Sequence, residues 1–300
     1  MSASLLWIPI TIGAALAQTI RNATQRSLSG DLGMLGATLV RFLYGLPFAA
    51  LWLFLVSFWE SFALPVPTAR FVVWVVIGAV AQIAATAFLL QAMARRNFAI
   101  GVAYSKTEVV QVALFGLVLL GDRISLPVAF SIVLATSGVV LVSAPPNARD
   151  AKAWFTPAAL YGLGSGAMLA VSVVGYRAAA LTIIEWGATL AAAFALVCAQ
   201  TIQTVGLGGY LAVRKPEVVR LVFSTWRVSL VAGLMGALAS MGWFTAFAME
   251  PAAHVRTLGL IELLFSYAIS RRIFRERLGP AELVGMLLLL IGVAGVTLTG

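Results

Sequence analysis

Charged side chains are scarce in this sequence of 300 residues, and acidic ones are the scarcest. Asp, Glu, Lys and Arg together make up 10% of the chain, whereas hydrophobic residues make up 61% and the mean hydropathy is +1.01. Soluble domains carry about 25% charged residues, so this composition excludes an ordinary soluble protein. The 20 basic residues outnumber the 11 acidic ones, but a chain this apolar is not expected to bind nucleic acid. The composition predicts a polytopic membrane protein whose surroundings are a lipid bilayer.

Cysteine and histidine are nearly absent as well. Cys198 is the single cysteine and His254 the single histidine. One cysteine excludes an intrachain disulfide, and the lack of an HExxH motif leaves no basis for a metal site or a membrane protease. No nucleophile with a base and an orienting group is recognisable. We therefore expect no catalytic residue, no metal, no cofactor and no enzyme activity.

Long apolar runs are what the chain has in abundance, and charged residues, proline and glycine interrupt them. Each run is close to the roughly 20 residues that a helix needs to cross a bilayer. Ten such runs are expected to form transmembrane helices, over the approximate ranges 4–21, 33–57, 70–93, 98–120, 125–143, 157–177, 184–212, 227–248, 253–273 and 280–299.

The sequence also repeats itself after 154 residues. This shift places Glu108 on Glu262 and Arg123 on Arg277. Charged matches are informative, because charges are rare in apolar segments. The chain is therefore expected to contain a duplication, divided by the polar stretch 145–152.

The two repeats cover residues 1–146 and 153–300, with five predicted helices each. Because five is odd, the second repeat must enter the membrane from the opposite side. The expected fold class is all-α, a polytopic membrane protein of ten transmembrane helices built as two inverted five-helix repeats. Secondary transporters use inverted repeats and bind their substrates near the middle of the bilayer.

Basic residues indicate the orientation of the chain. The first, third, fifth, seventh and ninth connections carry 14 of the 20 basic residues, beginning with Arg21. The opposite connections carry three, which are Arg70, Arg123 and Arg177. Because cytoplasmic connections are rich in Lys and Arg, the first set is expected to be cytoplasmic and both termini to lie outside.

A few charged or titratable side chains lie inside the apolar segments, where a charge costs about 3 kcal/mol on insertion scales. They are candidates for substrate binding or translocation, namely Arg41, Lys106, Glu108, His254, Arg256 and Glu262. The alternative is that they pair with one another, or reach the headgroups, and fix the packing of the helices. On a single helix Lys106 would point about 200° away from Glu108, so these two are not expected to pair on one face.

Uncharged polar side chains recur at helical spacing and extend this set. Tyr104 lies one turn before Glu108, and Gln18, Gln82 and Trp243 belong to stripes on the first, third and eighth segments. In lipid a polar stripe must face protein or water, so these faces are expected to converge on a central cavity. Hydrogen bonds between helices are the alternative for each of them, and Trp243 can equally pack between helices or stack on a substrate.

The end of each repeat resembles that of the EamA-type transporters of the drug/metabolite transporter superfamily, which include the YddG-like amino-acid exporters. The family's repeat runs from Glu-Pro through an apolar stretch to Gly-Glu-Arg and a last helix rich in Leu and Gly. This sequence has Glu-Val at 108–109 before Gly-Asp-Arg at 121–123, and Glu-Leu at 262–263 before Arg-Glu-Arg at 275–277. The usual proline is therefore replaced in both repeats. Many members of the family are held to keep both termini in the cytoplasm, and here we follow the charge count instead.

The resemblance implies export of small metabolites, amino acids above all, across the bacterial inner (plasma) membrane without ATP and by alternating access. A zwitterionic substrate needs a cation for its carboxylate and an acceptor or aromatic face for its ammonium group. Arg41 or Lys106 would supply the first. The second would come from Glu108, Glu262, Tyr104 or Trp243. Coupling to protons through one of the two glutamates and exchange without coupling are both open.

Other transporters of the same fold are the alternatives. A multidrug exporter would favour an aromatic cavity around a lone carboxylate, and the cations Arg41 and Lys106 disfavour a site for cationic drugs. A transporter of nucleotide sugars or lipid-linked metabolites would need a basic pocket. A purely structural role for the buried charges predicts that neutralising them alters stability and leaves flux unchanged.

Overall fold

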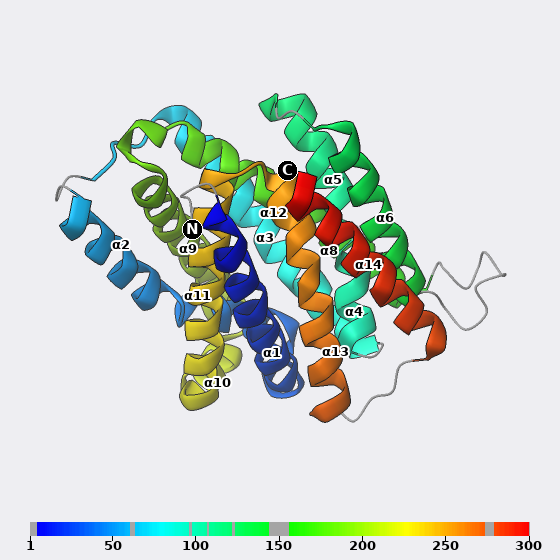
Figure 1. Ribbon diagram of the computed structural model, residues 1–300. Helices are drawn as coiled ribbons and strands as arrows, with labels where there is room; N and C mark the ends of the chain where they lie inside the picture. Colours follow the sequence, from blue (N-terminus) through cyan, green and yellow to red (C-terminus); the bar gives the residue numbers. More distant parts are fainter. Residues whose placement is uncertain are drawn as a thin grey trace. The chain divides into compact units, whose positions relative to one another are not determined.

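The computed structural model describes residues 5–60, 64–95, 98–106, 108–121, 124–143, 156–273 and 279–299. These residues form helices joined by short turns, and no strand occurs among them (Figure 1). The α-helices are α1 (Trp7–Leu43), α2 (Leu46–Glu60), α3 (Ala69–Arg95), α4 (Phe98–Ser105), α5 (Glu108–Phe115), α6 (Leu126–Ser143), α8 (Pro157–Leu181), α9 (Ala188–Arg214), α10 (Pro216–Ser224), α11 (Trp226–Met249), α12 (Ala252–Leu258), α13 (Glu262–Arg272) and α14 (Pro280–Thr299). A π-helical turn spans Gly116–Leu120, and 3₁₀ turns span Ile184–Trp186 and Gly259–Ile261.

Six helical stretches are long and apolar enough to cross a membrane. They are Trp7–Trp59, Ala69–Arg95, Pro157–Leu181, Ala188–Arg214, Trp226–Met249 and Ala252–Arg272. The structure thus has the all-helical, apolar character that the composition predicts for a polytopic membrane protein. Two of the charges that indicate the sequence repeat, Arg123 and Arg277, lie outside the described residues, as does the stretch 145–152.

The first helix departs from the predicted boundaries. α1 does not end near residue 21: its first helical piece runs to the kink at Gly33, and a second piece follows as far as Leu43. The hydroxyl groups of Thr24 and Ser29 donate to carbonyl oxygens one turn earlier and are satisfied within the first piece. The chain reverses at Gly33, whose φ of 67° is in the region that glycine adopts readily. Gln25 Nε2 donates to the Ala37 carbonyl oxygen at 2.7 Å. Twelve residues of straight helix would span about 18 Å, so this bond requires the chain to fold back.

The chain divides into two compact units, which differ from the two sequence repeats. Unit 1 comprises Met1–Ile83 and Val171–Glu250, and unit 2 comprises Ala84–Ala170 and Pro251–Gly300. The divisions fall inside α3 and inside α8. Each unit therefore contains residues from both repeats.

Unit 1 is built on close contacts between small residues. α1 and α11 pack along each other (Figure 1). At Gly242 of α11 an added Cβ would lie 2.7 Å from Ala14 Cβ, so this crossing requires glycine. A run of alanines on α9 packs with Phe71 and Phe244 in the core of the unit. Helices that meet through small residues are typical of membrane proteins, because close backbone approach maximises packing without a hydrophobic driving force.

Unit 2 uses the same principle between α6 and α14, which lie side by side (Figure 1). A Cβ at Gly292 would overlap the backbone of Ala135, and one at Gly295 would overlap the side chain of Ser131. Two glycines one turn apart thus bring α14 against α6. The helices α4 and α5 and the helical stretch α12–α13 belong to this unit and carry its buried charged residues.

Candidate functional site

Two helical segments of unit 2 change their geometry at positions that the sequence repeat relates: α4 ends at Ser105, and the stretch Ala252–Arg272 tightens to a 3₁₀ turn while staying helical. The predicted segment 98–120 consists of α4 and α5, and the predicted segment 253–273 consists of α12, a 3₁₀ turn and α13. Glu108 is the first residue of α5 and Glu262 the first residue of α13. The 154-residue shift that aligns the two glutamates therefore also aligns the start of α5 with the residue that follows the 3₁₀ turn. Neither the end of α4 nor the 3₁₀ turn was expected from the apolar periodicity.

The charges of these two segments form two crosswise ion pairs. Lys106 Nζ contacts Glu262 Oε2, and Arg256 Nη2 contacts Glu108 Oε1. In each pair, the cation belongs to one sequence repeat and the carboxylate to the other. All four side chains are buried, with exposed fractions between 0% and 4%. The prediction that Lys106 and Glu108 do not pair with each other agrees with this arrangement.

A helix terminus adds to the stability of one of these charges. Glu108 lies in the first turn of α5, where the N-terminal end of the helix dipole favours an anion. Arg256 and Glu262 lie within the helical stretch Ala252–Arg272, on either side of its 3₁₀ turn. Burying an isolated ion costs several kcal/mol, and pairing offsets part of that cost. The four charges sum to zero, so the cluster is electrically balanced as it stands.

Two further predicted site residues lie in unit 2. Tyr104 is buried near the end of α4 and packs on Ala159. A Cβ at Gly162 of α8 would overlap Tyr104 Cβ, so Gly162 permits α8 to approach α4 just before the break. His254 is buried on α12, two residues before Arg256.

Unit 1 contains other predicted residues, held by hydrogen bonds between uncharged groups. The Trp243 indole Nε1 donates to Gln18 Oε1 at 2.9 Å, and the Trp243 ring stacks on Phe247 with centroids 6.0 Å apart. Trp243 is thus fixed between α1 and a neighbouring ring of its own helix. The structure favours the packing interpretation for the indole N–H, since that group already has an acceptor.

Gln82 belongs to a three-residue network with Tyr176 and Gln203, neither of which is among the predicted site residues. The Tyr176 hydroxyl donates to Gln82 Oε1 at 3.0 Å. Gln203 Nε2 lies 2.7 Å from Gln82 Oε1, 3.0 Å from the Tyr176 hydroxyl oxygen and 3.2 Å from the Ala79 carbonyl oxygen, and donates to this group of acceptors. The signal that could have identified Gln203 is its position three residues after Gln200 inside an apolar segment, because two buried amides on one face need partners.

Arg41 lies close to Arg21, which the sequence places in the connection between the first two predicted helices. Both Arg41, at 4% exposure, and Arg21, at 2%, are buried in unit 1. A Cβ on Gly236 of α11 would lie 3.2 Å from Arg41 Cγ and 3.3 Å from Arg21 Cδ. The two side chains therefore meet over one glycine. Arg21 was counted with the basic connections because α1 was expected to end near it, and the longer helix places it in the interior instead.

A third buried arginine has a structural role. Arg177 near the end of α8 donates from Nη1 to the carbonyl oxygens of Phe247 and Glu250. These carbonyls belong to the C-terminal end of α11, where cations are favourable. Arg177 therefore ties α8 to the end of α11.

The predicted site residues thus fall into two groups. Gln18, Arg41, Gln82 and Trp243 lie in unit 1, and Tyr104, Lys106, Glu108, His254, Arg256 and Glu262 lie in unit 2. Each is buried or half-buried. Their convergence on one central cavity stays a prediction. In the part of the chain that the structure describes, no group of three His, Cys, Asp or Glu side chains could hold a metal.

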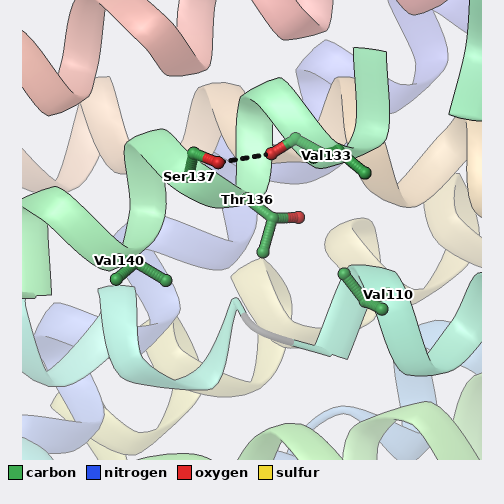
Figure 2. Close-up of a pocket in the computed structure, with 5 residues that line it drawn as sticks. All are labelled: Val110, Val133, Thr136, Ser137 and Val140. Atoms are coloured by element: carbon green, nitrogen blue, oxygen red, sulfur yellow. Dashed lines mark hydrogen bonds between the residues drawn. The ribbon is translucent and has the colours of Figure 1, made fainter. Parts of the chain in front are cut away.

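A groove on unit 2 has a different character. It has a volume of about 300 Å³ and is lined by Val110, Val133, Thr136, Ser137 and Val140 (Figure 2). The Ser137 hydroxyl donates to the Val133 carbonyl oxygen at 2.9 Å (Figure 2). The Thr136 hydroxyl donates to the Ile132 carbonyl oxygen of the same helix at 2.7 Å. Both hydroxyls are thus satisfied within α6, and none of the described residues that line the groove is charged. These residues form a mainly apolar surface.

Comparison with known proteins identifies the fold and no more. No protein-family model matches the sequence, and no curated protein matches it. A solved structure described as "Crystal structure of protein" is similar along nearly the whole chain, with a TM-score of 0.66, 16% sequence identity, and coverage of 97% of this chain and 96% of that one. At this identity the similarity concerns the arrangement of the helices.

Proposed function

We propose that this protein is a secondary transporter that exports small metabolites, with amino acids as the preferred class, by alternating access. The observation that carries the proposal is the pair of buried, crosswise ion pairs between two repeat-related segments, Lys106 with Glu262 and Arg256 with Glu108. The first segment is interrupted after α4, and the second tightens to a 3₁₀ turn between its two charges. Secondary transporters bind substrates and coupling ions where helices are interrupted near the bilayer midplane.

The cost of these charges supports a functional interpretation. A single charge at the centre of a transmembrane helix costs about 3 kcal/mol on insertion scales, and such residues in membrane proteins commonly mark pathways for substrates or protons. Each pair here joins the two sequence repeats. A rearrangement of one repeat against the other would therefore have to separate or exchange both pairs.

We propose the full architecture as ten transmembrane helices in two inverted repeats of the EamA type, placed in the bacterial inner membrane with both termini outside. The glutamates at matching positions and the 154-residue repeat support this. Burial of Arg21 and Arg177 removes one residue from each set of connections, and 13 basic residues still face two on the other side. The charge bias therefore continues to favour cytoplasmic odd-numbered connections.

The ion pairs also support a zwitterionic substrate. A carboxylate can replace Glu262 or Glu108 beside a cation, and an ammonium group can replace Lys106 or Arg256 beside a carboxylate. A zwitterion supplies both groups in one molecule, so it can exchange with the pairs without leaving a net buried charge. Release of a glutamate in this exchange would also allow it to take up a proton, which makes proton coupling one of the two transport modes that we propose to test.

The test is uptake into liposomes that contain the purified full-length protein, with a panel of labelled amino acids, with and without a pH gradient. We expect uptake of at least one amino acid. We expect Glu108→Gln and Glu262→Gln to reduce its rate about tenfold or more, which corresponds to ~1.4 kcal/mol in the barrier. The exposed Glu185 provides the matched control Glu185→Gln, which should transport normally. Uptake of a dye or a nucleotide sugar without any amino acid would contradict the preferred substrate class and favour the multidrug or nucleotide-sugar alternative.

Orientation is tested on the same protein by cysteine accessibility. Arg272→Cys introduces an exposed thiol at the end of α13 in a Cys198→Ala background. An impermeant reagent should fail to label it from outside intact cells. Labelling from outside would overturn the proposed orientation of the termini.

A further inference from the structure

We infer that a pocket at one end of unit 1 binds the headgroup of a phospholipid that carries both a phosphate and a primary ammonium group, as phosphatidylethanolamine does. The pocket has a volume of about 560 Å³, which is within the range of small-ligand sites. The residues that line it belong to α1 and to the turn between α10 and α11, and they include Ser27, Asp31, Ser224, Thr225, Trp226 and Arg227. The inference needs only the membrane-spanning helices and goes beyond the proposed transport.

The pocket lies where membrane-spanning stretches end. Trp226 and Arg227 are the first residues of the apolar stretch Trp226–Met249. Asp31 lies two residues before the reversal of α1 at Gly33. Tryptophan is common at the interface between the hydrocarbon core and water, and the Trp226 side chain is exposed. We therefore expect the pocket at the depth of the lipid headgroups.

α10 joins the two sides of the pocket. This short helix follows α9 and leads into α11, and it packs on α1 (Figure 1). A Cβ at Gly36 of α1 would lie 2.7 Å from Val218 Cγ1 of α10, so the two helices meet closely. The Tyr44 hydroxyl donates to the Val222 carbonyl oxygen at 3.1 Å. The end of α10 is thus held beside the part of α1 that carries Asp31.

Asp31 and Arg227 supply opposite charges to the pocket. Both are exposed, and neither forms an ion pair with another residue that the structure describes. Arg227 Cζ lies 5.5 Å from the centroid of the Trp226 ring, so a cation–π contact supports the guanidinium at the pocket. A guanidinium matches the oxygens of a phosphate group, and a carboxylate accepts hydrogen bonds from an ammonium group. A zwitterionic headgroup satisfies both residues at once.

Two hydroxyl groups of the lining add acceptors for the ammonium group. Ser27 Oγ donates to the Thr24 carbonyl oxygen at 2.7 Å, and Ser224 Oγ donates to the Leu221 carbonyl oxygen at 2.9 Å. Because their protons are engaged in this way, the two oxygens offer lone pairs to a ligand. A trimethylammonium group has no N–H to donate to them. The pocket should therefore favour an ethanolamine headgroup over a choline headgroup.

The surface beside the pocket suits the acyl chains of a lipid. Phe223, Trp226 and Val228 are large apolar side chains that stay exposed next to it. Contact with hydrocarbon chains removes this apolar surface from water. An anionic lipid would offer the same chains and phosphate, but it would lack the cation that Asp31 needs. The combination of charges and apolar surface thus favours a zwitterionic lipid over an anionic one.

The experiment measures lipid binding to the purified full-length protein by native mass spectrometry. Phosphatidylethanolamine, phosphatidylcholine and phosphatidylglycerol are compared with identical acyl chains. The wild type should bind phosphatidylethanolamine about fivefold or more tightly than the other two. Asp31→Asn should remove most of this preference, because it removes the charge that the ammonium group recognises. Arg227→Gln should weaken the binding of all three lipids about fivefold or more, because they share the phosphate.

The matched controls are Glu217→Gln and Arg220→Gln. They remove the same charges from exposed positions of α10 that are not part of the pocket lining. Both should keep the affinity and the preference of the wild type. Asp31 and Arg227 are exposed as well, so substitutions there are expected to leave the fold intact.

Two results would overturn the inference. One is equal binding of the three lipids by the wild type, or a preference that Asp31→Asn leaves unchanged. The other is a preference for phosphatidylglycerol that Arg220→Gln weakens as much as Arg227→Gln does, which would show a general attraction of anionic lipids to basic residues.

Glycerophosphoethanolamine, which is the same headgroup without acyl chains, distinguishes a lipid from a soluble ligand. At equal concentration it should not displace phosphatidylethanolamine, because it lacks the apolar contacts. Displacement would overturn the lipid as the ligand of this pocket. These measurements do not depend on amino-acid uptake, so failure of the inference and failure of the proposed function are distinguishable.

Discussion

The two units bury polar groups in different ways. Unit 2 concentrates opposite charges in two helical segments, where Lys106 pairs with Glu262 and Arg256 with Glu108. Unit 1 holds its buried polar groups mainly through uncharged hydrogen bonds, such as those of Gln203. An ion that loses its partner keeps a desolvation penalty of several kcal/mol, whereas a hydrogen bond between helices contributes about 0.6 kcal/mol on average. Single substitutions should therefore have much larger effects on stability in the paired cluster than in the amide network.

The largest effect is expected for Glu262→Gln. The change preserves the size of the side chain and leaves Lys106 buried without its carboxylate, which should lower the free energy of unfolding by about 3–5 kcal/mol. The measurement is unfolding by SDS titration of the purified protein. The double variant Lys106→Gln with Glu262→Gln removes both charges and should recover most of the loss. A loss of under 1 kcal/mol in the single variant would contradict the expected difference between the two units, since it would show that another group stabilises the charge of Lys106.

Much of the fold followed from composition and spacing. Apolar runs located most helices to within a few residues, as for α3 (Ala69–Arg95) against the predicted 70–93 and α14 (Pro280–Thr299) against 280–299. Lipid demands such runs of every spanning helix, so the signal is strong. The interruptions were harder to predict. The break between Ser105 and Glu108 contains neither proline nor glycine, so it depends on tertiary contacts that local sequence does not specify.

The sequence identified the charged residues of the candidate site but did not show which of them form ion pairs with each other. The cost of a charge in lipid identified Lys106, Glu108, Arg256 and Glu262 one at a time. Helical spacing excluded the pairing of Lys106 with Glu108. The crosswise pairs depend on which helices meet, and a single sequence does not contain that information. Arg21 was missed for a related reason, because its interior position follows from the length of α1.

A second test concerns the packing of the helix breaks in the two units. In unit 2 a Cβ at Gly162 would overlap Tyr104 next to the break after α4, and in unit 1 a Cβ at Gly233 would overlap Tyr44 at the break between α1 and α2. Gly162→Ala and Gly233→Ala should each lower the free energy of unfolding by about 1–3 kcal/mol, because the backbones must separate. The measurement is the same SDS titration.

The control for both variants is Gly206→Ala on α9, where an added Cβ has no neighbour within 4 Å. It should be neutral or slightly stabilising, since alanine favours helix more than glycine does. Similar losses in the two variants would show that the breaks are held in the same way. A loss of stability in Gly162→Ala alone would instead show that close helix packing matters more in unit 2 than in unit 1. A neutral Gly162→Ala would contradict the close contact with Tyr104.

The smallest effect is expected for Tyr176→Phe in unit 1, which matches Glu262→Gln in removing one polar function at nearly constant size. The change removes the bonds of the hydroxyl with Gln82 and Gln203 and keeps the ring, whose centroid lies 4.5 Å from that of Phe244. The 2.7 Å bond between the two amides can persist, so neither is left without a partner. The free energy of unfolding should fall by about 1 kcal/mol, within the range measured for hydrogen bonds between membrane helices.

Tyr210→Phe, at an exposed position of α9, is the control and should be neutral. A loss of about 3 kcal/mol or more for Tyr176→Phe would show that the amide network stabilises the protein as much as the ion pairs do. The two units would then differ in the type of their buried polar groups, and their contributions to the free energy of unfolding would be similar.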